Sequence, residues 1–71
     1  MTTNISSIEY NLLELYKNIG IDRPENHDKI LEFVEQDVKE TADHWIDTDG
    51  QVMWYYGDVA IAFRRFIESK Q

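Results

Sequence analysis

The sequence predicts an all-α domain, a small bundle of three helices, and two observations lead to this fold class. Apolar residues recur at three- and four-residue steps along most of the chain, which is the spacing of one face of a helix. With 71 residues the chain is long enough for one hydrophobic core and too short for two, so we expect a single domain over residues 1–71. The alternative is an α+β fold with a short hairpin around Asp49–Gly50 before the last helix.

The first helix is expected over residues 5–19. Ser6 is a candidate N-cap, and Glu9 three positions later can complete a capping box. Gly20 stands where a left-handed residue commonly closes a helix. The apolar face of this helix comprises Ile5, Ile8, Leu12, Leu15, Tyr16 and Ile19.

The second helix follows a short connection that contains Pro24, and it is expected to run to about Ile46. Asp22 and Asn26 are both candidate caps, because each can accept hydrogen bonds from the first turn. His27 is expected to decorate the start of this helix. The apolar face comprises Ile30, Phe33, Val34, Val38, Ala42 and Trp45.

A polar segment at residues 47–50 interrupts the helical pattern. We favour a third helix directly after it, capped by Thr48 with Gln51 completing a capping box, and ending at about Ser69. Apolar residues continue at helical spacing across Gly57, which supports one continuous helix.

The hairpin alternative places a two-residue turn at Asp49–Gly50, between strands at residues 44–48 and 51–56. The β-branched and aromatic residues of the second segment favour a strand. The first segment shows no clean alternation, however, and an isolated two-stranded hairpin is only marginally stable in water. We therefore expect the helix.

The balance of charged residues and the absence of cysteine exclude several classes of protein. Fourteen acidic against seven basic side chains give a net charge of -7, which opposes direct binding to nucleic acid or to an anionic membrane. Without cysteine there is no disulfide, thiolate nucleophile or Cys-based zinc site. No apolar run is longer than that of residues 52–56, which is too short to span a membrane, and the chain does not begin like a signal peptide. We therefore expect a cytoplasmic protein.

Residues that could support catalysis or hold a cofactor are few. Serine occurs only near helix ends and the three glycines are dispersed, so neither a nucleophile elbow nor a phosphate-binding loop is indicated. Glu40, His44 and Asp47 form a stripe of oxygen and nitrogen ligands, and a metal-dependent activity there is the least favoured hypothesis. We expect no enzymatic activity and no cofactor.

Acidic residues are concentrated in the middle of the chain. From Asp22 to Asp49 there are ten acids and three bases, a balance of -7. Such a surface either confers solubility or steers the protein towards a basic partner. The candidate partner-binding residues on this acidic helix are Glu32, Glu35, Glu40 and Asp43.

The last segment carries the opposite signal, since only three charged side chains occur between Val52 and Ile67. A helix that is apolar nearly all round must be buried nearly all round, and two other helices cannot surround it. Tryptophan, methionine and arginine are also enriched in protein interfaces. The candidate contact residues are Met53, Trp54, Ile61, Arg64 and Arg65.

These features predict a small acidic interaction protein, a regulator or inhibitor that binds another protein with a basic surface. An aromatic patch on the last helix would supply the affinity, and the acidic helix would supply orientation. The alternative is a homodimeric structural subunit whose acidic face serves solubility. Trp54 could also simply close the edge of the bundle over residues 47–50 within its own chain.

Overall fold

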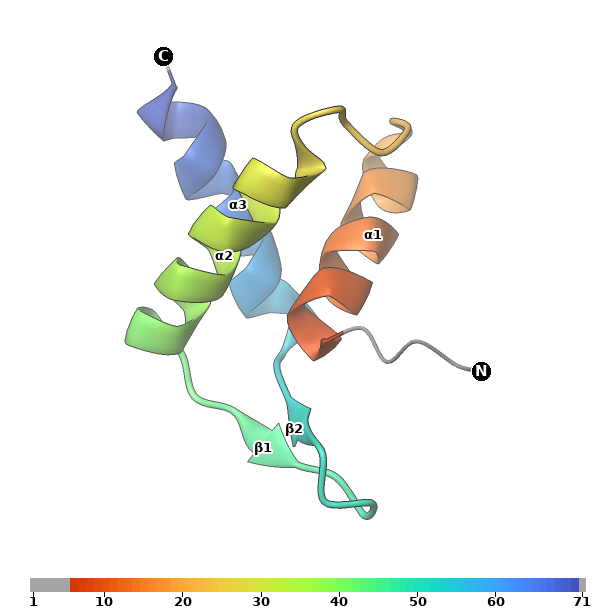
Figure 1. Ribbon diagram of the computed structural model, residues 1–71, viewed down its shortest axis with the longest axis vertical. Coiled ribbons are helices and arrows are strands. Elements are labelled where there is room, and N and C mark those ends of the chain that lie inside the picture. The colour runs from red at the N-terminus through yellow and green to blue at the C-terminus, as the bar shows by residue number, and fades with distance from the viewer. Residues whose placement is uncertain (1–5, 71) are drawn as a thin grey trace.

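The computed structural model describes residues 6–70 and consists of three helices with a small hairpin between the second and the third (Figure 1). The hairpin projects from one end of the bundle. The structure confirms the predicted three-helix bundle, and it also contains the hairpin that we had treated as the alternative. The elements are α1 (Ser7–Ile19), α2 (His27–Thr41), β1 (Trp45–Ile46), β2 (Val52–Met53) and α3 (Tyr56–Ser69).

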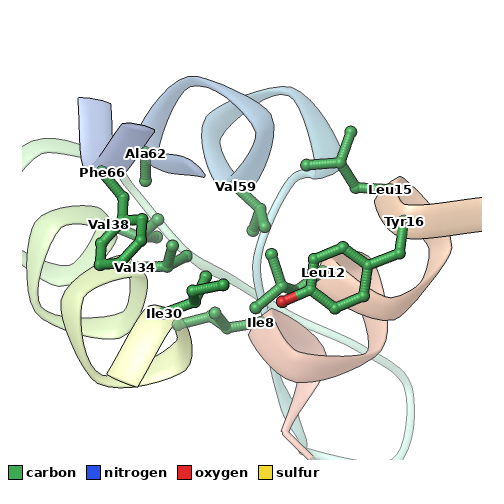
Figure 2. Packing of buried hydrophobic residues seen from close by; sticks show 10 residues of the cluster. All are labelled: Ile8, Leu12, Leu15, Tyr16, Ile30, Val34, Val38, Val59, Ala62 and Phe66. Carbon is green, nitrogen blue, oxygen red and sulfur yellow. The ribbon is translucent and has the colours of Figure 1, made fainter. Parts of the chain in front are cut away.

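All three helices contribute to one hydrophobic core, and Figure 2 shows their side chains meeting between the ribbons. The predicted apolar faces of α1 and α2 are largely confirmed, although Ile19 is exposed and Ile5 lies outside the described residues. Trp45 was predicted to join the core and does not, because α2 ends before it. The buried core residues are Ile8, Leu12, Leu15, Tyr16, Ile30, Val34, Val38, Val59, Ala62 and Phe66.

Both ends of α1 follow the signals in the sequence. The Ser6 hydroxyl accepts a hydrogen bond from the Glu9 backbone N–H at 3.1 Å, which satisfies one free donor of the first turn. Gly20 adopts a φ of 79°, and the N–H of Ile21 donates to the carbonyl of Tyr16 at 3.0 Å. This is the Schellman arrangement that a glycine after a helix makes possible.

The second helix ends at Thr41, so the predicted end near Ile46 is wrong. Ala42 is extended, with φ -124° and ψ 161°. The Thr41 hydroxyl donates to the carbonyl of Asp37 at 2.8 Å, a bond that competes with regular helical geometry. At the other end Asn26 occupies the N-cap position without a capping side-chain hydrogen bond.

The hairpin pairs β1 and β2 antiparallel, with Trp45 opposite Met53 and Ile46 opposite Val52. Its turn has three residues rather than the predicted two, because Asp47 donates its N–H to the carbonyl of Gln51 at 3.0 Å. Gly50 closes the turn with a φ of 81°, as a type I turn followed by a glycine bulge requires.

The side chain of Asp47 stabilises this turn from within. Its Oδ1 atom accepts hydrogen bonds from the N–H groups of Asp49 at 2.9 Å and Gln51 at 2.8 Å. A short acidic side chain that accepts from the backbone N–H two residues on is a common local stabiliser of turns. The polar segment that we interpreted as a helix start is therefore the tip of the hairpin.

Hydrogen bonds to α1 explain why the chain forms a hairpin and not a longer third helix. The Ser7 hydroxyl accepts from the Trp54 N–H at 3.0 Å and lies 3.3 Å from the Trp54 carbonyl, to which the Asn11 side-chain amide also donates at 2.9 Å. The backbone N–H and carbonyl groups of Trp54 are thus hydrogen-bonded although Trp54 is not in a helix. An isolated hairpin would be marginal, but this one is fastened to the bundle. The third helix consequently begins at Tyr56.

Candidate functional site

A buried polar cluster, formed by Glu9, Tyr16 and His27, joins α1 to α2. The His27 Nε2 atom lies 2.9 Å from Glu9 Oε2, and its Nδ1 atom lies 3.0 Å from the Tyr16 hydroxyl. His27 is the first residue of α2, as expected, but it is only 1% exposed, so the expectation of a surface histidine there is wrong. The sequence held one signal: Glu9 and Tyr16 are seven residues apart and share a face of α1.

The cluster has the order carboxylate, imidazole and hydroxyl, which is also the order of some catalytic relays. Here the hydroxyl belongs to Tyr16, which is 2% exposed and packs in the core. Because an ionised carboxylate can only accept, a His27 ring that bonds to Glu9 through Nε2 carries a hydrogen on that atom. The arrangement satisfies three polar groups and holds the two helices together.

Burial raises the pKa of Tyr16 from 10.0 to about 12, against the opposing effect of the Arg23 charge and with a smaller contribution from Glu9. An unfolded chain therefore releases this proton at lower pH than the folded protein. Stability from this group is complete below pH 10 and is lost as the pH rises towards about 12. We expect the urea midpoint to fall over this range, and Tyr16→Phe to show a shallower fall. Equal slopes in both proteins would contradict this assignment.

An open hollow between the hairpin and the start of α1 is the main candidate binding feature, and we call it the hairpin groove. It has a volume of about 640 Å³. None of the described residues that line it is charged. Ligand pockets are commonly about 300–1,000 Å³ and mostly apolar, which is the character of this hollow. The lining residues are Ser6, Ser7, Tyr10, Asn11, Trp45, Gln51, Val52, Met53 and Trp54.

The hairpin and the residues that follow it expose large apolar side chains. Trp45 is 41% exposed and Tyr55 is 55% exposed, and their ring centroids lie 6.2 Å apart. Ile46 and Val52, which pair across the two strands, are also exposed. Sequence reasoning missed both residues because Trp45 was assigned to the apolar face of the second helix and Tyr55 fell within the predicted third helix.

Met53 and Trp54 were predicted to project from the last helix, and this placement is wrong. Met53 belongs to β2 and Trp54 follows it, with both residues lining the hairpin groove. The Trp54 side chain is half-buried against the core, and its ring lies 5.5 Å from the His44 ring. Trp54 thus closes the end of the bundle, while Trp45 is the more exposed of the two tryptophans.

The other three candidate residues of the last segment lie on α3. Ile61 is exposed, Arg64 pairs with Glu68 at 3.7 Å, and Arg65 donates to Asp37 of α2 at 2.8 Å. Arg65 is about 14 Å along the helix from Tyr56, given a rise of about 1.5 Å per residue. The structure therefore does not gather the five predicted residues into one patch.

The predicted acidic residues lie along α2 and in the connection that follows it. Glu32, Glu40 and Asp43 are exposed, and Glu35 is half-buried. Glu40 accepts a hydrogen bond from Gln36 at 3.3 Å within the same helix. These side chains are available to a partner, and none of them lines the hairpin groove.

The stripe Glu40, His44 and Asp47 does not form a metal centre. Among residues 6–70, no three histidine or carboxylate side chains are grouped closely enough to hold an ion. The end of α2 at Thr41 explains this result, because the three residues no longer share a helix face. Within the same range no helix has the length and apolar character to cross a membrane.

Comparisons with known proteins leave the site to be interpreted from its geometry. No family model, no curated protein and no solved structure matches this chain.

Proposed function

We propose that this protein is a non-enzymatic regulator or inhibitor in the cytoplasm that acts by binding a basic protein. The single observation that carries the proposal is the exposed aromatic pair Trp45 and Tyr55, formed by the projecting hairpin and the residue before α3, next to the acidic helix α2. Exposed aromatic side chains beside a hollow are the usual anchors of protein interfaces.

The charge of the neighbouring segments supports a basic partner. From His27 to Tyr55, which covers α2 and the hairpin, eight acids and two bases give a balance of -6. Charges of one sign around a contact surface raise the rate at which an oppositely charged partner is captured. In this proposal the aromatic residues supply affinity, and Glu32, Glu35, Glu40 and Asp43 supply steering.

A pair of matched charge reversals tests the steering role. Glu32→Lys on α2 and Glu68→Lys on α3 change the net charge equally at exposed positions. After capture of a partner from the native cell, we expect Glu32→Lys to slow association several-fold at low salt and to weaken its salt dependence. Stopped-flow or surface-plasmon measurements give both rates. If the two variants have equal effects, the acidic face of α2 does not steer the partner and serves only solubility.

Self-association is the second candidate, favoured by one observation on the hairpin. Among the described residues the sheet contains only β1 and β2, so the outer edge of β1 pairs with no other strand. An open edge can pair with a second copy. A dimer would bring together two chains of charge -7, which opposes this arrangement. Sedimentation equilibrium at several concentrations and salt levels decides between a monomer and a dimer.

A further inference from the structure

We infer that the hairpin groove seats an apolar side chain of the basic partner, flanked in that partner by lysine or arginine residues. This inference rests on the proposed function and specifies how the partner is recognised. It follows from the chemistry of the groove walls, from the charge around the groove and from the position of the two tryptophans.

The walls of the groove offer apolar surface and little free hydrogen-bonding capacity. Among its polar side chains, Ser7 and Asn11 already bond to the backbone of Trp54, and Ser6 accepts from the Glu9 N–H. This leaves the Gln51 amide and the Tyr10 hydroxyl at the edge of the hollow. The remaining surface is dominated by indole, phenol, thioether and valine groups. A charged side chain placed there would lose water without gaining a partner of opposite charge, whereas an apolar side chain would lose nothing. The groove therefore selects an apolar anchor.

The charge near the groove determines which residues of the partner can flank that anchor. Residues 43–55, which form the hairpin and its flanks, contain three aspartates and neither lysine nor arginine. Asp43 and Asp49 are exposed; Asp43 precedes β1 and Asp49 lies in the turn between β1 and β2. Basic residues on either side of the anchor would meet these carboxylates, while a second copy of the chain would bring further negative charge.

The exposed rims of the groove come from two elements that are fixed to each other. Tyr10 on α1 and Trp45 on β1 are both exposed, and the bonds from Ser7 and Asn11 to Trp54 hold the hairpin against α1. The hollow is therefore formed before a partner arrives, which lowers the entropy cost of binding. A preformed apolar hollow with aromatic rims is typical of a site for an anchor residue.

Tryptophan fluorescence reports on this groove selectively. The chain has two tryptophans, Trp45 and Trp54, and both line the groove. The probes are three synthetic helical peptides of about four turns, one of leucine and lysine, one of leucine and glutamate, and one of serine and lysine. We expect the leucine–lysine peptide to shift the tryptophan emission to shorter wavelength and to shield the tryptophans from quenching by acrylamide. The other two peptides should leave emission and shielding nearly unchanged.

A matched pair of variants on α1 locates the effect. Tyr10 lines the groove and Ile19 does not, and both side chains are exposed, so neither replacement should disturb the core. Tyr10→Lys is expected to weaken the affinity for the leucine–lysine peptide about tenfold, which corresponds to the loss of one anchor contact. Ile19→Lys should change that affinity by no more than about twofold. Both variants carry the same net charge, and circular dichroism checks that both remain folded.

The outcomes separate this inference from the proposed function. If the serine–lysine peptide binds as tightly as the leucine–lysine peptide, the groove inference is overturned and binding of a basic partner stands. If the leucine–lysine peptide binds without shielding the tryptophans, the groove inference and the anchor role of Trp45 are both overturned, while binding of a basic partner stands. If neither basic peptide binds at low salt, both are overturned. Equal binding of the leucine–glutamate peptide also removes the inference, because charge would then play no part.

Two further outcomes identify another occupant and would also overturn the inference. If shielding of the tryptophans rises with protein concentration alone, a second copy fills the groove. If Ile5→Ser increases quenching in the absence of any peptide, the first residues of the same chain fill it.

Discussion

Replacing His27 with alanine is expected to lower the free energy of unfolding by about 3 kcal/mol, because it leaves a cavity and removes the partner of two polar groups. The imidazole is buried and bonds to both Glu9 and Tyr16. For a domain of this size each kcal/mol corresponds to roughly 4–8 °C in melting temperature. Urea and thermal unfolding followed by circular dichroism measure the loss.

The control for this variant is Glu9→Gln. The glutamine side chain can still accept a hydrogen bond from the His27 ring, so we expect a loss of about 1 kcal/mol or less. If His27→Ala costs no more than Glu9→Gln, the buried polar cluster does not stabilise the contact between α1 and α2.

The second large effect is expected for Trp54→Ala, with a loss of about 2–3 kcal/mol in the free energy of unfolding. Trp54 is half-buried against the core and contacts His44, so its removal leaves a cavity at the end of the bundle. The matched control is Trp45→Ala. Trp45 is 41% exposed, and we expect that change to cost about 1 kcal/mol or less.

This pair separates a structural tryptophan from an interaction tryptophan. If Trp45→Ala destabilises the protein as much as Trp54→Ala does, the hairpin is held by both side chains, and the exposed aromatic pair has a structural explanation. If neither variant is destabilised, the packing of Trp54 against the core is not significant for stability.

The first helix could be predicted because its signals are local. Ser6 and Gly20 act within a few residues of the helix ends, and the sequence contains both the capping residue and the residue it caps. Two expectations failed in this helix: Ile19 is exposed, and the capping box did not form. The carboxylate of Glu9 instead bonds to His27, which is 18 residues away along the chain.

The hairpin could not be decided from the sequence because the deciding contacts are long-range. The residues from Val52 to Tyr56 have side chains that suit a helix face as well as a strand. What selects the hairpin is the pairing of the Trp54 backbone with Ser7 and Asn11, more than 40 positions earlier. Isolated two-stranded hairpins are only marginally stable, but this hairpin is hydrogen-bonded to α1, so that argument did not exclude it.

The same contacts changed the candidate site. We expected the last segment to carry more apolar side chains than the bundle can bury, and it does expose several. We placed the exposed ones on α3, however, because we assumed one continuous helix. With α3 beginning at Tyr56, Met53 and Trp54 line the hairpin groove, while Arg65 bonds to α2. The exposed aromatic residues are instead Trp45 and Tyr55, because the helical segments predicted to contain them do not form.

The most direct test of the proposed interaction is the affinity of the captured partner for Trp45→Ala, measured by calorimetry beside the wild-type protein and Ile61→Ser. With the fold intact, Trp45→Ala should weaken binding about tenfold or more, the effect of losing an aromatic anchor, and Ile61→Ser should change it little. Unchanged affinity in Trp45→Ala, together with a loss in Ile61→Ser, would contradict binding at the hairpin and place the contact on α3.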